Sequence, residues 1–303
     1  MSTNGRSDKP TIILIHGLWL TPRSFEKWID RFERAGYNVM APSWPGLEGE
    51  VEELRRNPSP LKGLKLARVV DHYVKIITKL STPPILMGHS FGGLIVQVLL
   101  DRGLGAAGVG IDAAATAGVL TLPLAQIRSV FPILGNPFSL NQAVMLTPEQ
   151  FNYAFTNELD PVASKKVYDR YAIPGAAHIL WEAATANFNP NAASRIDYSN
   201  STRAPLLFIA GGKDHTVPAS VNRANVQKHI NNTTAITDYR EFPERTHNTV
   251  NQTGWEEVAD FALDWARTHA IGQVNYDDVR TAFKPDIVAS PPRDNVFIRE
   301  LQE

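Results

Sequence analysis

The amino-acid sequence predicts an α/β fold in which a mostly parallel central sheet is covered by helices on both of its faces. Short apolar runs rich in β-branched residues alternate along the chain with longer segments in which apolar residues recur every three or four positions. Strands that are apolar throughout are typical of parallel sheets, and the amphipathic segments are typical of the helices that cover such sheets. The 303 residues are enough to bury the core of one large domain or of two small ones.

The first part of the chain contains four apolar runs and three helical segments. The predicted strands lie at residues 11–15, 37–41, 84–88 and 107–111. The predicted helices lie at residues 21–35, 64–80 and 90–102. The first helix shows the pattern most clearly, because Phe25, Trp28 and Phe32 share one of its faces. Pro22 stands at the start of this helix and Gly36 ends it, as helix termini favour.

The second part of the chain contains a long interruption of this alternation. Between residues 113 and 203 the alternation stops, in a region rich in Ala, Pro, Asn and aromatic residues. The pattern then resumes, with strands at 205–210 and 237–242 and helices at 219–230 and 254–269. An excursion that leaves a sheet and returns to it predicts an inserted helical lid. We therefore expect a core formed by residues 1–112 and 204–269 and a lid formed by residues 113–203.

Residues 270–303 form a polar C-terminal extension that contains three prolines and no sustained period. A solvated tail is one interpretation of such a segment. Packing of the extension against something else, such as a second subunit in a homodimer, is the other.

Composition limits the partners and cofactors of the protein. The formal net charge is −1 and no basic block stands out, so binding to nucleic acid or to an anionic membrane is not predicted. The absence of cysteine excludes disulfides, thiolate catalysis and iron–sulfur sites, and we predict no cofactor or metal. The first ten residues are polar and no run approaches the ~18 apolar residues of a spanning helix. We expect a cytoplasmic protein without membrane insertion.

The sequence Gly88-His89-Ser90-Phe91-Gly92 lies between a predicted strand and a predicted helix. This is the pattern G-x-S-x-G in the strand–turn–helix context that gives the pattern its meaning. A turn sharp enough to hold the serine oxygen above the sheet brings the residues two before and two after the serine into collision, so both are glycine. Ser90 is the predicted nucleophile.

Four segments together resemble the α/β-hydrolase superfamily, and specifically its lid-bearing esterases and lipases. These segments are IILIHGLW, ILMGHSFGGL, GGKDHTVP and THNTV. The resemblance covers roughly residues 11–269 and implies the α/β-hydrolase fold. Its motifs are specific for the superfamily and not for a substrate.

The resemblance implies a base and an acid for the serine. A serine hydroxyl needs an adjacent base that is oriented by a third group. His247 is the predicted base, because it follows both the serine and the acid in chain order, as the fold requires. Asp214, in the pattern G-x-x-D-x-x-V-P after a predicted strand, is the favoured acid. Asp112, at the end of the preceding predicted strand, is the rival, because some members of the superfamily place the acid there.

The same resemblance implies an oxyanion hole made of two backbone N–H groups. One belongs to Phe91, the residue after the nucleophile, and the other to Leu18 in the loop His16-Gly17-Leu18-Trp19. This loop lacks the glycine-rich HGGG sequence, which argues against esters of bulky tertiary alcohols.

A mainly apolar substrate pocket is expected beside this loop. Trp19, His89 and Trp181 are the predicted pocket residues, although His16 and His89 are also interpreted as structural histidines that shape the active-site turns. The lid contains further large side chains, and a few of them should face the substrate. These side chains are Phe131, Phe138, Met145, Phe151, Tyr153, Phe155 and Phe188.

These observations predict hydrolysis of a carboxylic ester, thioester or lactone through an acyl-serine. The predicted partner is a neutral, apolar small molecule with a short-to-medium acyl chain. A serine nucleophile argues against the dehalogenase and epoxide hydrolase branches, which use aspartate. A lyase or perhydrolase with the same residues, and a ligand-binding receptor with a vestigial triad, are the alternatives.

Overall fold

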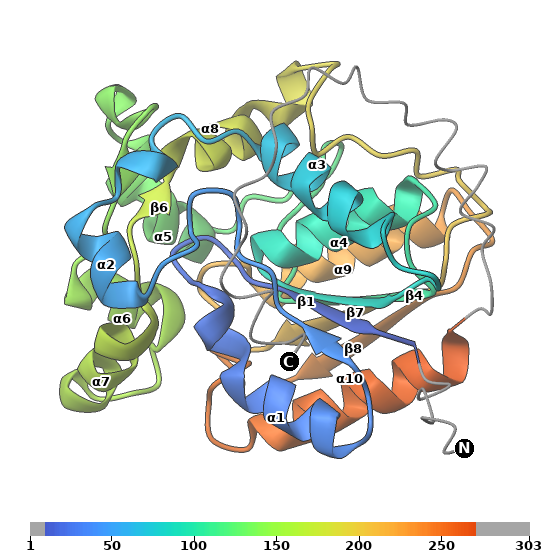
Figure 1. The fold of residues 1–303 in the computed structure, drawn as a ribbon. Coiled ribbons are helices and arrows are strands. Elements are labelled where there is room, and N and C mark those ends of the chain that lie inside the picture. Colours follow the sequence, from blue (N-terminus) through green and yellow to red (C-terminus); the bar gives the residue numbers. More distant parts are fainter. Residues whose placement is uncertain (1–9, 271–303) are drawn as a thin grey trace.

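The central sheet of the computed structural model, which describes residues 10–270, has six strands in the order β2-β1-β3-β4-β7-β8 (Figure 1). Every neighbouring pair in it is parallel. The strands are β1 (Ile12–Ile15), β2 (Val39–Met40), β3 (Ile85–His89), β4 (Ala107–Ile111), β7 (Leu206–Gly211) and β8 (Thr237–Phe242). The predicted parallel sheet is therefore confirmed, with each predicted strand present.

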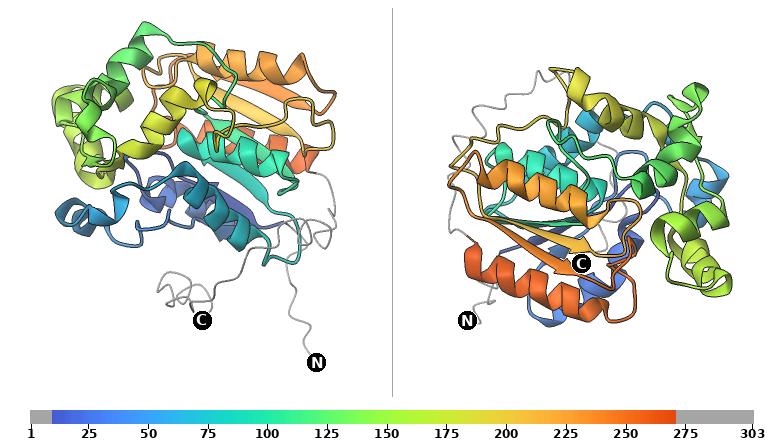
Figure 2. Two further views of the ribbon diagram at one scale, coloured as in Figure 1. Left: turned by 90° about the horizontal axis from the view of Figure 1, so that it is seen from above. Right: turned by 180° about the vertical axis from the view of Figure 1, so that it is seen from behind.

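Helices cover both faces of this sheet, as the apolar strands require. On one face lie α1 (Glu26–Arg34) and α10 (Trp255–His269); on the other lie α3 (Leu66–Ile77), α4 (Phe91–Asp101) and α9 (Ala219–Ile230) (Figures 1 and 2). Alternate residues of β1 serve the two layers, since Ile12 packs with Trp28 of α1 whereas Ile13 packs with Leu94 of α4. Burial on both faces explains why the central strands β1, β3, β4 and β7 are largely apolar, whereas the edge strand β8, with the sequence TDYREF, is mostly polar and alternates in burial.

The structure differs from the prediction in two details. The helix predicted at residues 21–35 begins as a 3-10 turn, η1 (Pro22–Phe25), which Thr21 caps, and only then continues as α1. The short helix α2 (Val51–Arg56) and the turn η2 (Ser59–Leu61) were not predicted. Six residues are too few to show a helical period, and α2 depends instead on the capping box formed by Glu50 and Glu53.

The insertion, residues 113–203, folds into helices and one small sheet. It contains α5 (Leu124–Leu134), α6 (Pro148–Phe155), α7 (Pro161–Tyr171), α8 (Ala177–Thr185), the 3-10 turns η3 (Pro137–Ser139) and η4 (Ala186–Phe188), and the antiparallel pair β5 (Ala143–Val144) and β6 (Gly175–Ala176). Figures 1 and 2 show α5, α6, α7 and α8 gathered beyond one end of the central sheet. Several hydrogen bonds join the insertion to loops at the carboxyl ends of the strands, among them Trp19 Nε1 to Val144 O, Ile173 N to Trp19 O, Asn248 N to Phe155 O and Thr216 Oγ1 to Ala154 O.

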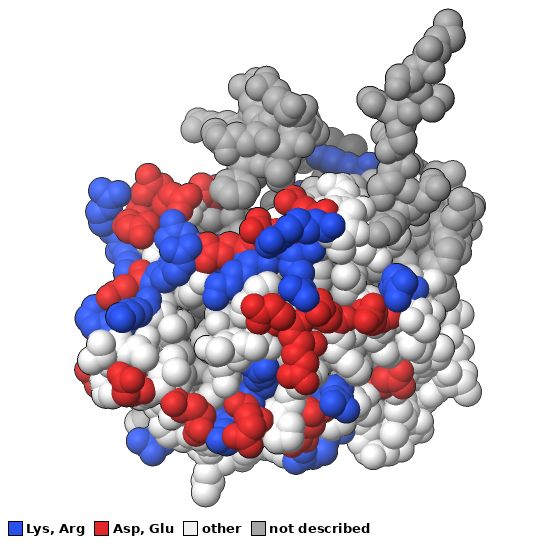
Figure 3. Space-filling view, turned by 90° about the horizontal axis from the view of Figure 1, so that it is seen from below, with Lys and Arg blue, Asp and Glu red and all other residues white. Residues whose placement is uncertain are grey.

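The surface on the side of α1 and α10 carries acidic and basic side chains close to one another (Figure 3). Arg31 pairs with Asp260 across these two helices. Within residues 10–270, no helix has both the length and the apolar character needed to cross a bilayer. The predicted C-terminal extension and its proposed role in a homodimer lie outside the described residues, apart from Ala270.

Candidate active site

Ser90 occupies the sharp turn between β3 and α4. Its backbone has φ 56° and ψ −118°, a conformation that residues other than glycine rarely adopt. A Cβ on Gly88 would lie 2.2 Å from the carbonyl of Gly92, and a Cβ on Gly92 would lie 2.0 Å from the Ile15 carbonyl oxygen. Both glycines of the motif are therefore required by close backbone contact. The predicted collision across the turn accounts for Gly88, whereas a side chain on Gly92 would collide with the end of β1.

Ser90, His247 and Asp214 form a hydrogen-bonded chain. His247 Nε2 lies 3.0 Å from Ser90 Oγ, and His247 Nδ1 lies 2.6 Å from Asp214 Oδ2. All three side chains are buried, Ser90 being 4% exposed. The carboxylate fixes the imidazole proton on Nδ1, so Nε2 is free to accept the serine proton.

Asp214 is anchored by the turn that follows β7. Its Oδ1 accepts hydrogen bonds from Thr216 N at 2.7 Å and Val217 N at 2.8 Å, which leaves Oδ2 for the histidine. Burial lowers the pKa of His247, but the charge and hydrogen bond of Asp214, with a smaller contribution from Asp112, outweigh burial and raise this pKa overall. The site therefore stabilises the imidazolium that proton transfer from serine would create.

Asp112, the rival acid, makes no hydrogen bond to the histidine. It directly follows β4, has φ 47°, is fully buried, and accepts a hydrogen bond from Gly211 N at 2.7 Å. Burial, and next the charge of Asp214, raise its pKa to about 8. The structure thus places Asp214, and not Asp112, on the ring of His247.

His89 and His16 support the turns around the serine. His89 Nε2 lies 2.8 Å from the His247 carbonyl oxygen, and burial holds its pKa well below the ordinary value. His16 Nδ1 lies 3.0 Å from Gly17 O, Trp44 N donates to its Nε2 at 3.3 Å, and burial lowers its pKa to about 4. The pocket position predicted for His89 needs correction, because its ring is used to hold the histidine loop.

The described residues contain one cluster of side chains whose ligand atoms are close enough together to hold a metal ion. His89, Asp112 and His247 offer ligand atoms that all lie within 4.8 Å of one another. Both ring nitrogens of His247 are already engaged, by Ser90 and by Asp214. The group therefore belongs to the hydrogen-bonded network around Ser90.

The loop after β1 lies against Ser90. Gly17 is in close contact with Ser90, because a Cβ on Gly17 would lie 2.8 Å from Ser90 Cβ. The predicted N–H donor Leu18 is the next residue in the chain. Phe91, the other predicted donor, is the first residue of α4, where backbone N–H groups have no partner within the helix. Trp19 holds the loop in a left-handed backbone conformation with φ 65°.

A narrow apolar crevice, too tight in this structure to hold a water molecule, lies between this loop and the insertion. Its lining residues carry no charge: Gly17, Leu18, Trp19, Leu20, Trp44, Leu47, Leu61, Ile173, Pro174, Gly175 and Ala176. Trp19 lines the crevice as predicted. Trp181 does not, because its indole nitrogen binds Ser139 Oγ at 3.0 Å within the insertion.

Two contacts near the site had only a weak signal in the sequence, or none. Phe155 of α6 packs edge-on against the ring of His247, with ring centroids 4.8 Å apart. The sequence placed it only among the lid aromatic residues. Trp44 stacks on His16 at 5.0 Å, although nothing in its surroundings in the sequence marks it as part of the site.

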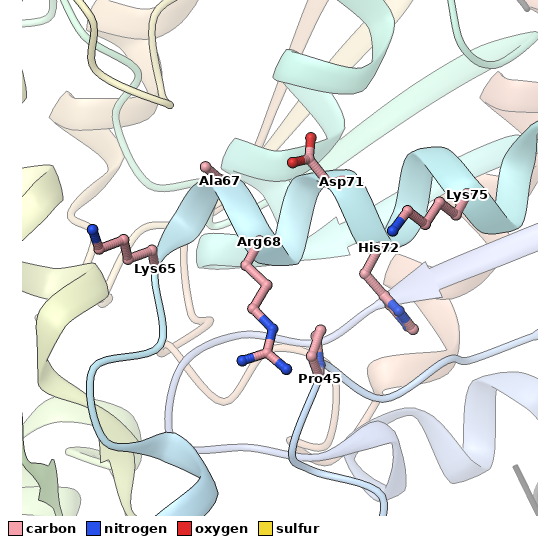
Figure 4. Close-up of a pocket in the computed structure, with 7 residues that line it drawn as sticks. All are labelled: Pro45, Lys65, Ala67, Arg68, Asp71, His72 and Lys75. Atoms are coloured by element: carbon pink, nitrogen blue, oxygen red, sulfur yellow. The ribbon is translucent and has the colours of Figure 1, made fainter. Parts of the chain in front are cut away.

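A second, open pocket lies away from these groups along the outer side of α3 (Figure 4). It has a volume of about 480 Å³ and is lined by Pro45, Lys65, Ala67, Arg68, Asp71, His72 and Lys75. None of the residues around Ser90 lines it, so we do not assign it to the same site.

Comparison with known proteins identifies the family and supports the fold. The sequence model of the Alpha/beta hydrolase family matches residues 12–261. The magnesium-chelatase 30 kDa subunit of Rhodobacter capsulatus is 30% identical over 230 residues, which are 72% of this chain and 75% of that protein. An extracellular alpha/beta-hydrolase from a Paenibacillus species has a similar fold, with a TM-score of 0.60, 18% identity, and coverage of 84% of this chain and 98% of that one. A monoacylglycerol lipase from Paleococcus ferrophilus has a TM-score of 0.57, 20% identity, and coverage of 86% and 95%. The matched region contains the sheet, the nucleophile turn and the histidine loop, and the chain belongs to the α/β-hydrolase family.

Proposed function

We propose that this protein is a serine hydrolase that cleaves neutral, apolar carboxylic esters, lactones or thioesters through an acyl-serine intermediate. The observation that carries the proposal is the hydrogen-bonded chain from Ser90 Oγ through His247 to Asp214, with distances of 3.0 and 2.6 Å. A serine on a strained turn, a base within hydrogen-bond reach and a carboxylate behind the base are the groups that acyl transfer needs.

The reaction would proceed in two halves. Ser90 Oγ attacks the substrate carbonyl carbon while His247 Nε2 takes the serine proton, and Asp214 stabilises the resulting imidazolium. The N–H groups of Leu18 and Phe91 would bind the oxygen that becomes negative. The imidazolium then gives its proton to the leaving alcohol, and an acyl-serine remains. Water attacks this ester with His247 again acting as base, which releases the acid and restores Ser90.

The lining of the crevice supports an apolar substrate. No charged residue lies among the side chains that form it, so a charged acyl group would lose its hydration without gaining a partner. Each methylene removed from water contributes ~0.8 kcal/mol, which favours longer acyl chains until the insertion obstructs them. Among the structural neighbours, one is a monoacylglycerol lipase, which is consistent with ester chemistry.

Access to the serine would depend on movement of the insertion. Ser90 is 4% exposed and His247 is fully buried, with Phe155 from α6 packed against the histidine ring. We propose that residues 113–203 act as a lid that opens to admit substrate and limits the length of the acyl chain. Lid opening of this kind gates turnover in many enzymes.

Specificity constants for matched ester substrates test this proposal. We expect neutral 4-nitrophenyl butyrate or hexanoate to exceed a carboxylate-bearing analogue by at least about tenfold in kcat/KM. A preference for the charged ester would contradict the proposed substrate class and indicate a basic residue of the insertion, such as Arg128, near the acyl group. Absence of ester turnover in a protein whose serine still reacts would favour the lyase or perhydrolase alternatives.

A further inference from the structure

The open pocket along α3 has a basic lining that the proposed reaction does not use. Pro45, in the loop after β2, forms one wall of this groove. The other wall is a stripe of basic side chains on the helix: Lys65, Arg68, His72 and Lys75. These positions follow one another at intervals of three or four residues, so they share one face of α3. Like charges at this spacing destabilise a helix, so stability of α3 does not account for the stripe.

The lysine and arginine side chains of this groove are unpaired, unlike most cations of the protein. Six lysine and arginine side chains within residues 10–270 make no hydrogen bond, ion pair or aromatic contact: Lys62, Lys65, Arg68, Lys75, Lys79 and Lys166. All except Lys166 lie on α3 or within four residues of its ends. Arg68 is the one arginine of the described chain in this state. Positive charge without a counter-charge therefore gathers at the groove.

The one carboxylate among the lining residues does not neutralise these cations. Asp71 pairs instead with Arg102, at 3.4 Å. In Figure 4, Arg68 and His72 project from α3 toward Pro45, whereas Asp71 points to the opposite side of the helix. The groove therefore presents three cations toward which no carboxylate of its lining is directed.

The two walls of the groove are joined by a hydrogen bond behind it. Tyr73 Oη, on the buried side of α3, donates to Pro42 O at 2.7 Å and so holds the loop after β2 against the helix. Burial lowers the pKa of His72, and the charge of Glu48 on the facing loop opposes this shift without reversing it. The positive charge of the groove at neutral pH therefore comes from lysine and arginine.

We propose that the groove along α3 is a binding site for a small molecule that carries two or more phosphate groups. Its cations extend over ten positions of the helix, ~15 Å along the axis, which matches several anionic groups better than one. Arg68 binds one phosphate through two N–H groups, and Lys65 and Lys75 bind neighbouring groups as point charges. The volume of about 480 Å³ is typical of small-molecule sites. The inference does not depend on the proposed hydrolase activity.

Calorimetric titration of the full chain with inorganic tripolyphosphate, at physiological ionic strength, tests the site. We expect saturable binding of one tripolyphosphate, with a Kd at least about tenfold lower than that of inorganic phosphate. Arg68→Gln should raise the Kd for tripolyphosphate by about fivefold, and the double variant with Lys75→Gln by at least about twentyfold. These side chains are exposed and glutamine suits a helix, so the variants should fold.

Lys166→Gln is the matched control, because it removes an unpaired, exposed cation from α7 and changes the net charge equally. Its Kd for tripolyphosphate should equal that of the wild type. Absence of saturable binding, or equal losses in Lys166→Gln and Arg68→Gln, would overturn the proposal. Inorganic phosphate that binds as tightly as tripolyphosphate would contradict a site for two or more groups.

Protection from acetylation locates the ligand without any substitution. Tripolyphosphate should slow acetylation of Lys65 and Lys75, measured by peptide mass spectrometry, and leave the rate at Lys166 unchanged. Equal rates at Lys65 and Lys75 with and without tripolyphosphate would place its binding outside this groove and contradict the proposal.

A soluble compound and a lipid head group both offer several phosphate groups, and vesicles separate these two sources. If the source is a head group, phosphatidylcholine vesicles that contain phosphatidylinositol bisphosphate should sediment the wild type and Lys166→Gln but not Arg68→Gln. If the source is a soluble compound, the wild type should bind tripolyphosphate and stay in the supernatant. Sedimentation that Arg68→Gln and Lys166→Gln reduce equally would contradict a defined site on α3.

Discussion

The central sheet and the insertion differ in how they use apolar side chains. In the sheet, residues such as Leu14 and Phe208 are at most 1% exposed and pack between two helical layers. In the insertion, Leu124 and Phe138 are 85% and 89% exposed. Other large apolar side chains of the insertion are exposed as well: Leu120, Leu122, Ile127, Phe131, Leu140, Val162 and Phe188. The sheet is a closed core, whereas the insertion leaves apolar surface facing solvent.

This difference assigns separate tasks to the two regions. Ser90, Asp214 and His247 all follow strands of the sheet, so a rigid hydrogen-bonded framework sets the distances between them. The insertion contributes side chains such as Phe155 that lie on the site, and several hydrogen bonds join it to the loops of the sheet. We infer that the chemistry depends on the sheet and that access and selectivity depend on the insertion.

The largest expected effect comes from the sheet's own catalytic groups. Ser90→Ala and His247→Ala should each lower kcat by about 10⁵- to 10⁶-fold, with similar losses because the residues act as a unit. Steady-state kinetics on a neutral ester measures this. Ser201→Ala, at an exposed turn, is the matched control and should keep wild-type activity. Substantial turnover in Ser90→Ala would place the nucleophile elsewhere.

The same substitution in the two regions should have very different effects on stability. Leu14→Ala removes a 1% exposed side chain from β1 and should lower the free energy of unfolding by about 3–5 kcal/mol. Leu124→Ala removes an 85% exposed side chain from α5 and should change it by less than about 0.5 kcal/mol. Urea unfolding followed by circular dichroism gives both values. A large loss in Leu124→Ala would mean that this face of the insertion is covered in solution.

The link between the regions is tested by two tryptophan substitutions of the same kind. Trp19→Phe removes the hydrogen bond to Val144 O that joins the loop after β1 to the insertion, and should lower kcat/KM by about tenfold. Trp181→Phe removes a comparable bond to Ser139 within the insertion and should leave kcat/KM unchanged. Equal effects of the two variants on kcat/KM would show that the crevice does not depend on Trp19.

The smallest expected effect is a shift in the pH dependence of the wild type. The neutral form of His247 accepts the serine proton, so kcat/KM falls as pH decreases through the pKa of this histidine. Because Asp214 raises that pKa, activity should be lost at a higher pH than the ordinary value of about 6.5 would give. A profile of kcat/KM against pH measures the position of this limb. An acid limb below the ordinary value would contradict the described electrostatics.

The sequence allowed prediction of the core because its elements are regular. The central strands β1, β3, β4 and β7 are largely apolar at successive positions, and α4 begins within a motif whose glycines are required sterically. The pairing of His247 with Asp214 depended on family resemblance, since 33 residues separate the two in the chain and spacing alone does not bring them together. The side-chain geometry that ranks Asp214 above Asp112 is visible only in the folded structure.

The insertion could not be resolved into elements from its sequence. Its helices expose apolar residues such as Phe131 and contain Pro132 within α5, so no apolar stripe of the usual kind marks them. Trp181 was expected at the pocket because it is large and apolar. In the structure, Trp181 instead donates a hydrogen bond to Ser139, and no local sequence pattern predicts this contact.

Covalent labelling with a fluorophosphonate tests the central claim most directly, because only an activated serine reacts. The claim is that Ser90 is made nucleophilic by His247 at 3.0 Å. Intact mass and peptide mapping should find one label, on Ser90, in the wild type, and none in Ser90→Ala or His247→Ala. A folded wild type that stays unlabelled, or a label that persists in Ser90→Ala, would contradict the account.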